Sequence, residues 1–173
     1  MGQLLIWWDT ETTGLDPRAD RVLEVAVSIA DLHDPFTLRP GYDTVVWFPP
    51  TEQADMTLSA YVKEMHTRNG LLAECASPLA PNLRLVEQRL LELVPEVESR
   101  DDRPTLAGST VHFDHAFIKH HMPQLAQRLS HRHYDVSGLK LYCESMGMPR
   151  FRKAEAHRAR PDVEESAQHA REC

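Results

Sequence analysis

Cysteine is scarce in this chain, and its scarcity argues against two kinds of site. The 173 residues include three cysteines, Cys75, Cys143 and Cys173, and no Cys-x-x-Cys pair occurs among them. A small, odd number of widely spaced cysteines is untypical of a disulfide-stabilised domain, and it provides no thiolate zinc site. We therefore predict a protein of a reducing compartment, the cytoplasm.

The chain also lacks a long apolar run and a surplus of basic residues. No stretch is long enough to span a bilayer, so the sequence predicts no membrane partner. The formal net charge is -7 at pH 7. Loose binding along long nucleic acids depends on many basic groups that neutralise phosphates, so this charge argues against it. An acidic enzyme that holds metal ions against a short substrate has no such requirement.

The composition that remains is typical of a globular protein. Hydrophobic residues make up 42% of the chain and charged residues 26%, without an internal repeat or a low-complexity tract. A chain of this length can bury a substantial core. We predict a single domain over residues 1–173.

Two carboxylates follow the first apolar stretch. Leu4–Trp8 is apolar and β-prone, and side chains alternate between the faces of a strand, so Asp9 and Glu11 should point the same way. Two carboxylates presented together repel each other unless a cation lies between them, and oxygen ligands suit Mg²⁺ or Mn²⁺. By itself, the pattern Asp-x-Glu also fits a polar turn after a strand.

The order of the expected elements predicts the fold class. Strands at 4–8, 22–30 and 44–48, with Asp34-Pro35 and Pro40-Gly41 bracketing a turn region, predict an antiparallel meander. Further strands are expected at 105–107 and 133–136, and helices from 57 to about 69 and at about 83–94, 114–121, 123–130, 137–146 and 161–173. This order predicts an α/β fold with a mixed five-stranded sheet covered by helices on both faces.

Three further polar residues fall at the ends of expected elements. Asp114 lies where a strand and loop lead into a helix, and alone it also fits a helix N-cap. Pro161 is placed to open the last helix, so His157 belongs to the preceding loop and Asp162 to the first helical turn. Taken separately, both also fit solvated polar residues.

Together with Asp9 and Glu11, these residues resemble the DEDDh 3′–5′ exonucleases. The motifs are Asp9-Thr10-Glu11-Thr12-Thr13-Gly14-Leu15, Gly108-Ser109-Thr110-Val111-His112-Phe113-Asp114, and His157 with Asp162. The likeness covers nearly the whole chain and is strongest to the oligoribonucleases. The supporting stretches are 56–66, 69–71, 117–118, 122–125, 135–140 and Glu165-Ser166.

The resemblance implies an RNase H-like exonuclease fold and a defined chemistry. It implies two divalent metal ions, Mg²⁺ or Mn²⁺, held by four carboxylates, which are those of Asp9, Glu11, Asp114 and Asp162. His157 completes the catalytic set, because histidine can take a proton from the attacking water near neutral pH. The expected reaction removes nucleoside 5′-monophosphates from the 3′ end of short single-stranded RNA.

The resemblance also carries over substrate-binding positions. Gly14 and Leu15 follow the first motif, and Leu15 matches an apolar wedge against the terminal bases. Tyr61 stands where oligoribonucleases usually have Trp; it fits either a base-stacking residue or a core aromatic of its helix. His66 and Thr110 match positions that contact substrate.

One position departs from the family pattern. The sequence has His131-Arg132 where oligoribonucleases carry Tyr-Arg as a phosphate cap donated by the neighbouring subunit. The expected assembly is therefore a homodimer. Arg132 keeps the positive charge and the forked hydrogen-bond donors of the family's Arg. Because the Tyr is missing, the sequence does not decide whether the protein strictly prefers dinucleotides. Pro161 and the short tail also depart from the pattern and leave less helix for dimer contacts.

Two alternative functions remain at this point. A DEDDh exonuclease that acts on single-stranded DNA or on longer RNA 3′ ends would carry the same motifs, because these motifs do not distinguish ribose from deoxyribose. A catalytically silent nucleic-acid-binding module on the same fold is less consistent with five filled catalytic positions.

Two clusters of basic and histidine residues also allow more than one interpretation. Six histidines could suggest zinc, but no carboxylate or cysteine spacing joins them into a site, so surface or core positions are favoured. They are residues 112, 115, 120, 121, 131 and 133. The segment 150–160 is rich in cations and fits either an attractor of substrate phosphates or a solvated loop. Its cations are Arg150, Arg152, Lys153, Arg158 and Arg160.

Overall fold

A mixed sheet is the centre of the fold in the computed structural model, which describes residues 3–49, 58–151 and 157–173. Its strands are β1 (Leu4–Thr12), β2 (Val22–Asp31), β3 (Asp34–Val45), β4 (Thr105–Gly108) and β5 (His133–Asp135). They lie in the order β3-β2-β1-β4-β5. The first three strands pair antiparallel, whereas β4 runs parallel to β1 and β5 parallel to β4. This confirms the predicted meander and the mixed five-stranded sheet.

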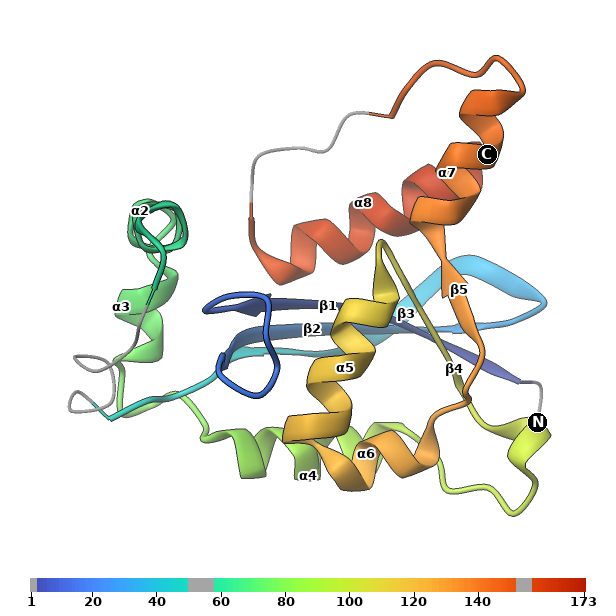
Figure 1. Cartoon of the computed structure of the whole chain (residues 1–173). Helices are drawn as coiled ribbons and strands as arrows, with labels where there is room; N and C mark the ends of the chain where they lie inside the picture. The colour runs from blue at the N-terminus through green and yellow to red at the C-terminus, as the bar shows by residue number, and fades with distance from the viewer. Residues whose placement is uncertain (1–2, 50–57, 152–156) are drawn as a thin grey trace.

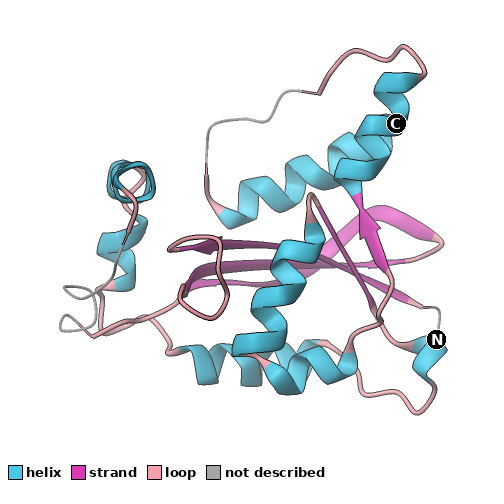
Figure 2. Ribbon diagram, viewed as in Figure 1, coloured by secondary structure: helices cyan, strands magenta, loops and turns pink. Residues whose placement is uncertain are grey.

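Helices cover both faces of this sheet (Figure 1). They are α3 (Leu71–Cys75), α4 (Leu83–Leu93), α5 (Val111–His121), α6 (Pro123–Arg128), α7 (Val136–Ser145) and α8 (Ala159–Glu172). α2 (Ala60–Arg68) packs against α3, to one side of the sheet (Figure 1). α7 and α8 pack on one face, and α4, α5 and α6 on the other (Figures 1 and 2). Neighbouring side chains of β1 point into different cores: Trp7 joins the α8 side and Trp8 the α5 side.

The predicted third strand was misplaced. It was expected at 44–48, but β3 spans Asp34–Val45 and runs through the residue pairs that were expected to form turns. Because β3 is the edge strand of the sheet, the missing N–H groups of Pro35 and Pro40 are tolerated there. Gly41 lies at an irregularity in the pairing with β2, where a β-carbon would overlap the carbonyl oxygen of Val27.

Two helices begin earlier than expected, and one of these shifts matters for the site. α5 begins at Val111, so Asp114 lies inside its first turn, and the N-cap interpretation of Asp114 was wrong. α8 begins at Ala159, and Pro161 lies within its first turn, where a missing N–H leaves no hydrogen bond broken. Within the described ranges, no helix has both the length and the apolarity needed to cross a bilayer.

Candidate active site

Three carboxylates from two elements meet at the end of the central strand. Asp9 and Glu11 lie on β1, two positions apart and therefore on one side of the strand, and Asp162 comes from the first turn of α8. Each offers an oxygen atom, and the three oxygens lie within 4.8 Å of one another. Negatively charged oxygen ligands at this spacing suit a hard divalent cation. The structure thus brings together three of the four predicted metal ligands.

The fourth predicted ligand, Asp114, lines the same pocket from α5. This pocket has a volume of about 490 Å³ and contains all four carboxylates. Burial raises the pKa of Asp114; hydrogen bonds from the hydroxyl and backbone N–H of Thr10 oppose that shift, and the charge of Glu11 adds to it. An ionised carboxylate is costly to bury unless a positive charge lies nearby, so this donor set fits a bound cation.

The raised pKa of Asp114 predicts how metal-free stability depends on pH. Because the folded state holds this proton more tightly than the unfolded chain, the contribution of Asp114 to stability is present below the ordinary range of an aspartate. This contribution is lost as the pH rises through the raised pKa of Asp114 in the folded state. In EDTA, we expect the melting temperature to fall more between about pH 5.5 and about pH 7.5 for wild type than for Asp114→Asn.

Differential scanning fluorimetry of both proteins at the two pH values measures this difference. Adding Mn²⁺ at the higher pH should stabilise wild type more than the variant. Parallel pH dependence of the two proteins in EDTA would show that Asp114 does not carry the effect.

A second pocket adjoins the first and has an apolar lining. It has a volume of about 650 Å³ and shares Thr10, Glu11, Leu15, Phe113 and His157 with the carboxylate pocket. Leu15 is 83% exposed and Tyr61, on α2, is 67% exposed, and both line this second pocket. Tyr61 is therefore not a core aromatic of its helix. Exposed apolar side chains beside the carboxylates provide a surface on which bases can stack.

Three other predicted substrate-binding residues lie around these pockets. Gly14 lines the apolar pocket, in a turn where a β-carbon would collide with the carboxylate of Asp20. Thr110 is exposed at the start of α5 with a φ of 59°, and its N–H donates to Oδ1 of Asp135 at 3.1 Å. His66 is fully buried and also lines the apolar pocket, with its Nε2 3.7 Å from Oε2 of Glu11. Burial lowers the pKa of His66.

His157 lines both pockets from the loop that precedes α8. Its φ of 46° lies in the left-handed region, which residues other than glycine seldom adopt. Its carbonyl oxygen accepts a hydrogen bond of 2.7 Å from the side-chain amide of Asn69. All five predicted catalytic side chains thus lie around one cavity.

The predicted phosphate cap does not reach this cavity within the described chain. His131 and Arg132 are exposed just before β5, and neither lines either of the two pockets. In the described ranges, the group of three or more potential metal ligands is Asp9, Glu11 and Asp162, and it includes none of the six histidines. His115 and His133 instead bond to each other, at 3.1 Å between ring nitrogens.

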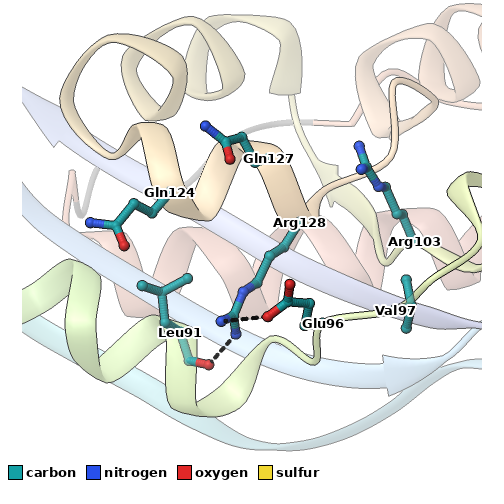
Figure 3. Close-up of a pocket in the computed structure, with 7 residues that line it drawn as sticks. All are labelled: Leu91, Glu96, Val97, Arg103, Gln124, Gln127 and Arg128. Atoms are coloured by element: carbon teal, nitrogen blue, oxygen red, sulfur yellow. Dashed lines mark hydrogen bonds and ion pairs between the residues drawn. The ribbon is translucent and has the colours of Figure 1, made fainter.

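A separate cavity lies between α4 and α6 and shares no lining residue with the carboxylate pocket (Figure 3). Arg128 crosses it and donates to the carbonyl oxygens of Leu91 and Val94, at 2.7 and 2.8 Å. These carbonyls belong to the last turn of α4 and its C-cap, so Arg128 caps that helix. The Glu96 carboxylate accepts a longer hydrogen bond from Arg128, at 3.5 Å.

Sequence reasoning assigned no role to several residues that line the carboxylate pocket. Lys140 and Glu165 lie in stretches that carried the family resemblance, but nothing in their local pattern indicated a side chain facing the site. Thr10 was known only as the residue between two ligands, and the structure shows that it bonds to Asp114.

Comparison with known proteins identifies an exonuclease family and, within the matches, relatives that are oligoribonucleases. The model of the exonuclease family RNase_T matches residues 6–169. The chain is 34% identical over 168 residues to the oligoribonuclease of Mycobacterium sp. (strain KMS), covering 94% of this chain and 75% of that protein. It is also 34% identical over 170 residues to the mitochondrial oligoribonuclease of Mus musculus, covering 96% and 70% of the two chains. The chain therefore belongs to the exonuclease family, as a relative of the oligoribonucleases.

A solved structure confirms the predicted RNase H-like exonuclease fold. E. coli exonuclease I in complex with a dT13 oligonucleotide superposes with a TM-score of 0.71 at 15% identity. The match covers 97% of this chain and 40% of exonuclease I, so the present chain spans less than half of that protein.

Proposed function

We propose that the protein is a metal-dependent 3′–5′ exoribonuclease that degrades short single-stranded RNA to nucleoside 5′-monophosphates. The observation that carries this proposal is the meeting of the oxygens of Asp9, Glu11 and Asp162 within 4.8 Å, beside an apolar pocket that holds Leu15 and Tyr61. The similarity to oligoribonucleases over most of the chain supports the choice of short RNA.

The carboxylates provide the binding site for two divalent ions. Asp9, Glu11 and Asp162, with Asp114 beside them, would hold Mg²⁺ or Mn²⁺. When bound, such ions stabilise the negative charge on the attacking and leaving oxygens of an in-line displacement at phosphorus.

The remaining site residues orient the substrate and move the proton. Tyr61 stacks on a terminal base, Leu15 packs against the terminal bases as an apolar wedge, and Gly14, Thr110 and His66 shape the walls around them. His157 takes a proton from the attacking water as its oxygen bonds to phosphorus. The bond between phosphorus and the 3′ oxygen of the preceding nucleotide then breaks. That oxygen takes up a proton from water and becomes the new 3′ hydroxyl, and the terminal nucleotide leaves as a nucleoside 5′-monophosphate.

A substrate panel tests this assignment. An RNA dinucleotide, a DNA dinucleotide and a long single strand are each incubated with Mg²⁺, Mn²⁺ or EDTA. The proposal expects metal-dependent cleavage that is fastest on the RNA dinucleotide. Preference for DNA or for the long strand would favour the general DEDDh exonuclease, and no metal-dependent cleavage of any substrate would favour the silent binding module.

The phosphate cap requires a second subunit in this proposal. His131 and Arg132 line neither pocket of their own chain, which supports donation of the cap across a homodimer. We expect Arg132→Ala to slow cleavage of a 5′-phosphorylated dinucleotide about 10- to 100-fold more than cleavage of a long strand. A charge-assisted hydrogen bond to phosphate contributes a free energy of this size. Steady-state rates on the two substrates measure the difference.

Arg84→Ala is the matched control, since Arg84 is exposed on α4 and lines neither pocket. Light scattering of the wild type determines whether the dimer exists. A monomer, or an equal loss of activity of Arg132→Ala on both substrates, would contradict the cap.

Cellular location and domain organisation complete the proposal. The cytoplasmic location rests on the scarcity of cysteines, and Cys75, Cys143 and Cys173 are all free thiols in the structure. Helices of the described ranges pack on both faces of one sheet, and α2 packs against α3, which supports a single exonuclease domain over residues 1–173.

A further inference from the structure

Arg158 joins three elements immediately beside the proposed general base. It follows His157 in sequence and is the N-cap residue of α8, the helix that carries Asp162. Its Nε donates to both oxygens of Glu24 at 3.1 and 3.0 Å, and its Nη2 donates to Glu24 Oε1 at 2.8 Å. The guanidinium also bonds to both oxygens of Glu74, at 3.0 and 2.8 Å. Arg158 thus ties the start of α8 to β2 and to α3.

Glu24 is the buried partner in this network. It accepts a further hydrogen bond, of 2.9 Å, from the backbone N–H of Ala159, the first residue of α8. In the sheet, Glu24 on β2 pairs directly with Glu11 on β1. Like charges directly opposite each other on paired strands repel, and the guanidinium of Arg158 offsets the charge of Glu24. Arg158 therefore balances a carboxylate that lies next to a proposed metal ligand.

Asn69 holds the backbone just before Arg158, at the carbonyl group of His157. Its side-chain amide donates to the carbonyl oxygen of His157 at 2.7 Å, and its Oδ1 accepts from the N–H of Leu71 at 3.1 Å. A residue in a sparsely populated backbone conformation keeps it only where the surroundings determine it strongly. Asn69 bonds to the carbonyl oxygen of His157, and Arg158 follows directly in sequence, so both supply such a constraint on the C-terminal side of His157.

These contacts answer the open question about the basic segment for two of its five cations. Arg158 and Arg160 were candidates for attracting substrate phosphates, but both guanidinium groups are committed to ion pairs. Arg160 bonds to Asp43 and to the hydroxyl of Ser28, each at 2.6 Å. Arg152 and Lys153 lie outside the described residues.

We infer that Arg158 is a positioning residue: together with Glu24, Glu74 and Asn69, it holds His157 in place beside the carboxylate pocket. The inference rests on the proposed function for the role of His157. It assigns no contact with substrate to Arg158, which acts through the backbone that it fixes.

Kinetics of Arg158→Gln test this role. Because a small displacement of a catalytic group costs up to about 10²-fold, we expect kcat to fall about 10- to 100-fold, with KM and Mn²⁺ affinity changed less than about threefold. Arg158→Lys should recover part of the loss, since lysine keeps the charge but not the fork. Arg160→Gln loses an ion pair from the same helix end and should leave kcat within about twofold of wild type.

A double variant separates positioning from a merely structural effect. If Arg158 acts through His157, then Arg158→Gln should cost less than about threefold in kcat in a His157→Ala background. Equal losses in both backgrounds would overturn the inference.

An NMR measurement without substrate or metal keeps this test separate from that of the proposed function. The ¹H–¹³C ring resonance of His157 is assigned by its disappearance in His157→Ala. It should shift or broaden in Arg158→Gln and stay in place in Arg160→Gln. An unchanged His157 resonance in Arg158→Gln would overturn the inference, whether or not the enzyme cleaves RNA.

Discussion

Asp162→Asn is expected to abolish metal-dependent cleavage and to leave the fold intact. Asparagine keeps the shape of the buried side chain in the first turn of α8, but it removes a negative charge from the cluster with Asp9 and Glu11. Loss of an outer-shell partner of a metal ligand costs 10- to 100-fold in affinity or activity, so we expect loss of a ligand to cost at least about 100-fold in Mn²⁺ affinity. Calorimetric Mn²⁺ titration and single-turnover cleavage measure the two effects.

Glu164→Gln provides the control for this prediction. Glu164 lies two residues further along the same helix, is exposed and lines neither pocket, so its variant should bind Mn²⁺ and cleave RNA as wild type does. Similar losses in Asp162→Asn and Glu164→Gln would mean that the general charge of α8 matters, rather than a metal ligand.

His157→Ala is expected to separate proton transfer from metal binding. Removing a general base slows the chemical step by about 10²- to 10⁴-fold. Mn²⁺ affinity should stay close to that of wild type, because the proposed ligands are carboxylates and His157 lies in the loop before α8, outside the elements that carry all four of them. Single-turnover rates at saturating Mn²⁺ isolate the step, and calorimetry measures the affinity. If His157→Ala lost as much Mn²⁺ affinity as Asp162→Asn, His157 would be a ligand and not the base.

The parts of the site that depend on local geometry could be predicted from the sequence. The shared orientation of Asp9 and Glu11 follows from the alternation of side chains along one strand. The placement of Asp162 in a first helical turn follows from Pro161 nearby. Their meeting with Asp114 in one cavity depended on the family resemblance, because it joins β1, α5 and α8.

Other features depend on contacts that a local pattern does not contain. The limits of β3 were missed because prolines usually mark turns, and the sequence does not reveal which strand lies at the sheet edge. The exposure of Tyr61 depends on how α2 lies relative to the rest of the fold. The link between Arg158 and Glu24 joins residues 134 positions apart, and from the sequence Arg158 was only one cation in a basic segment.

The direction and product of cleavage test the central claim most directly. A short RNA labelled at its 5′ end, and the same RNA labelled in its 3′-terminal nucleotide, are digested with Mn²⁺ and with EDTA. With Mn²⁺, the 3′ label should be released first as a nucleoside 5′-monophosphate, while the 5′-labelled strand shortens one nucleotide at a time; EDTA should stop both. Internal cleavage, release of nucleoside 3′-phosphates, or digestion that persists in EDTA would contradict a metal-dependent 3′–5′ exonuclease site.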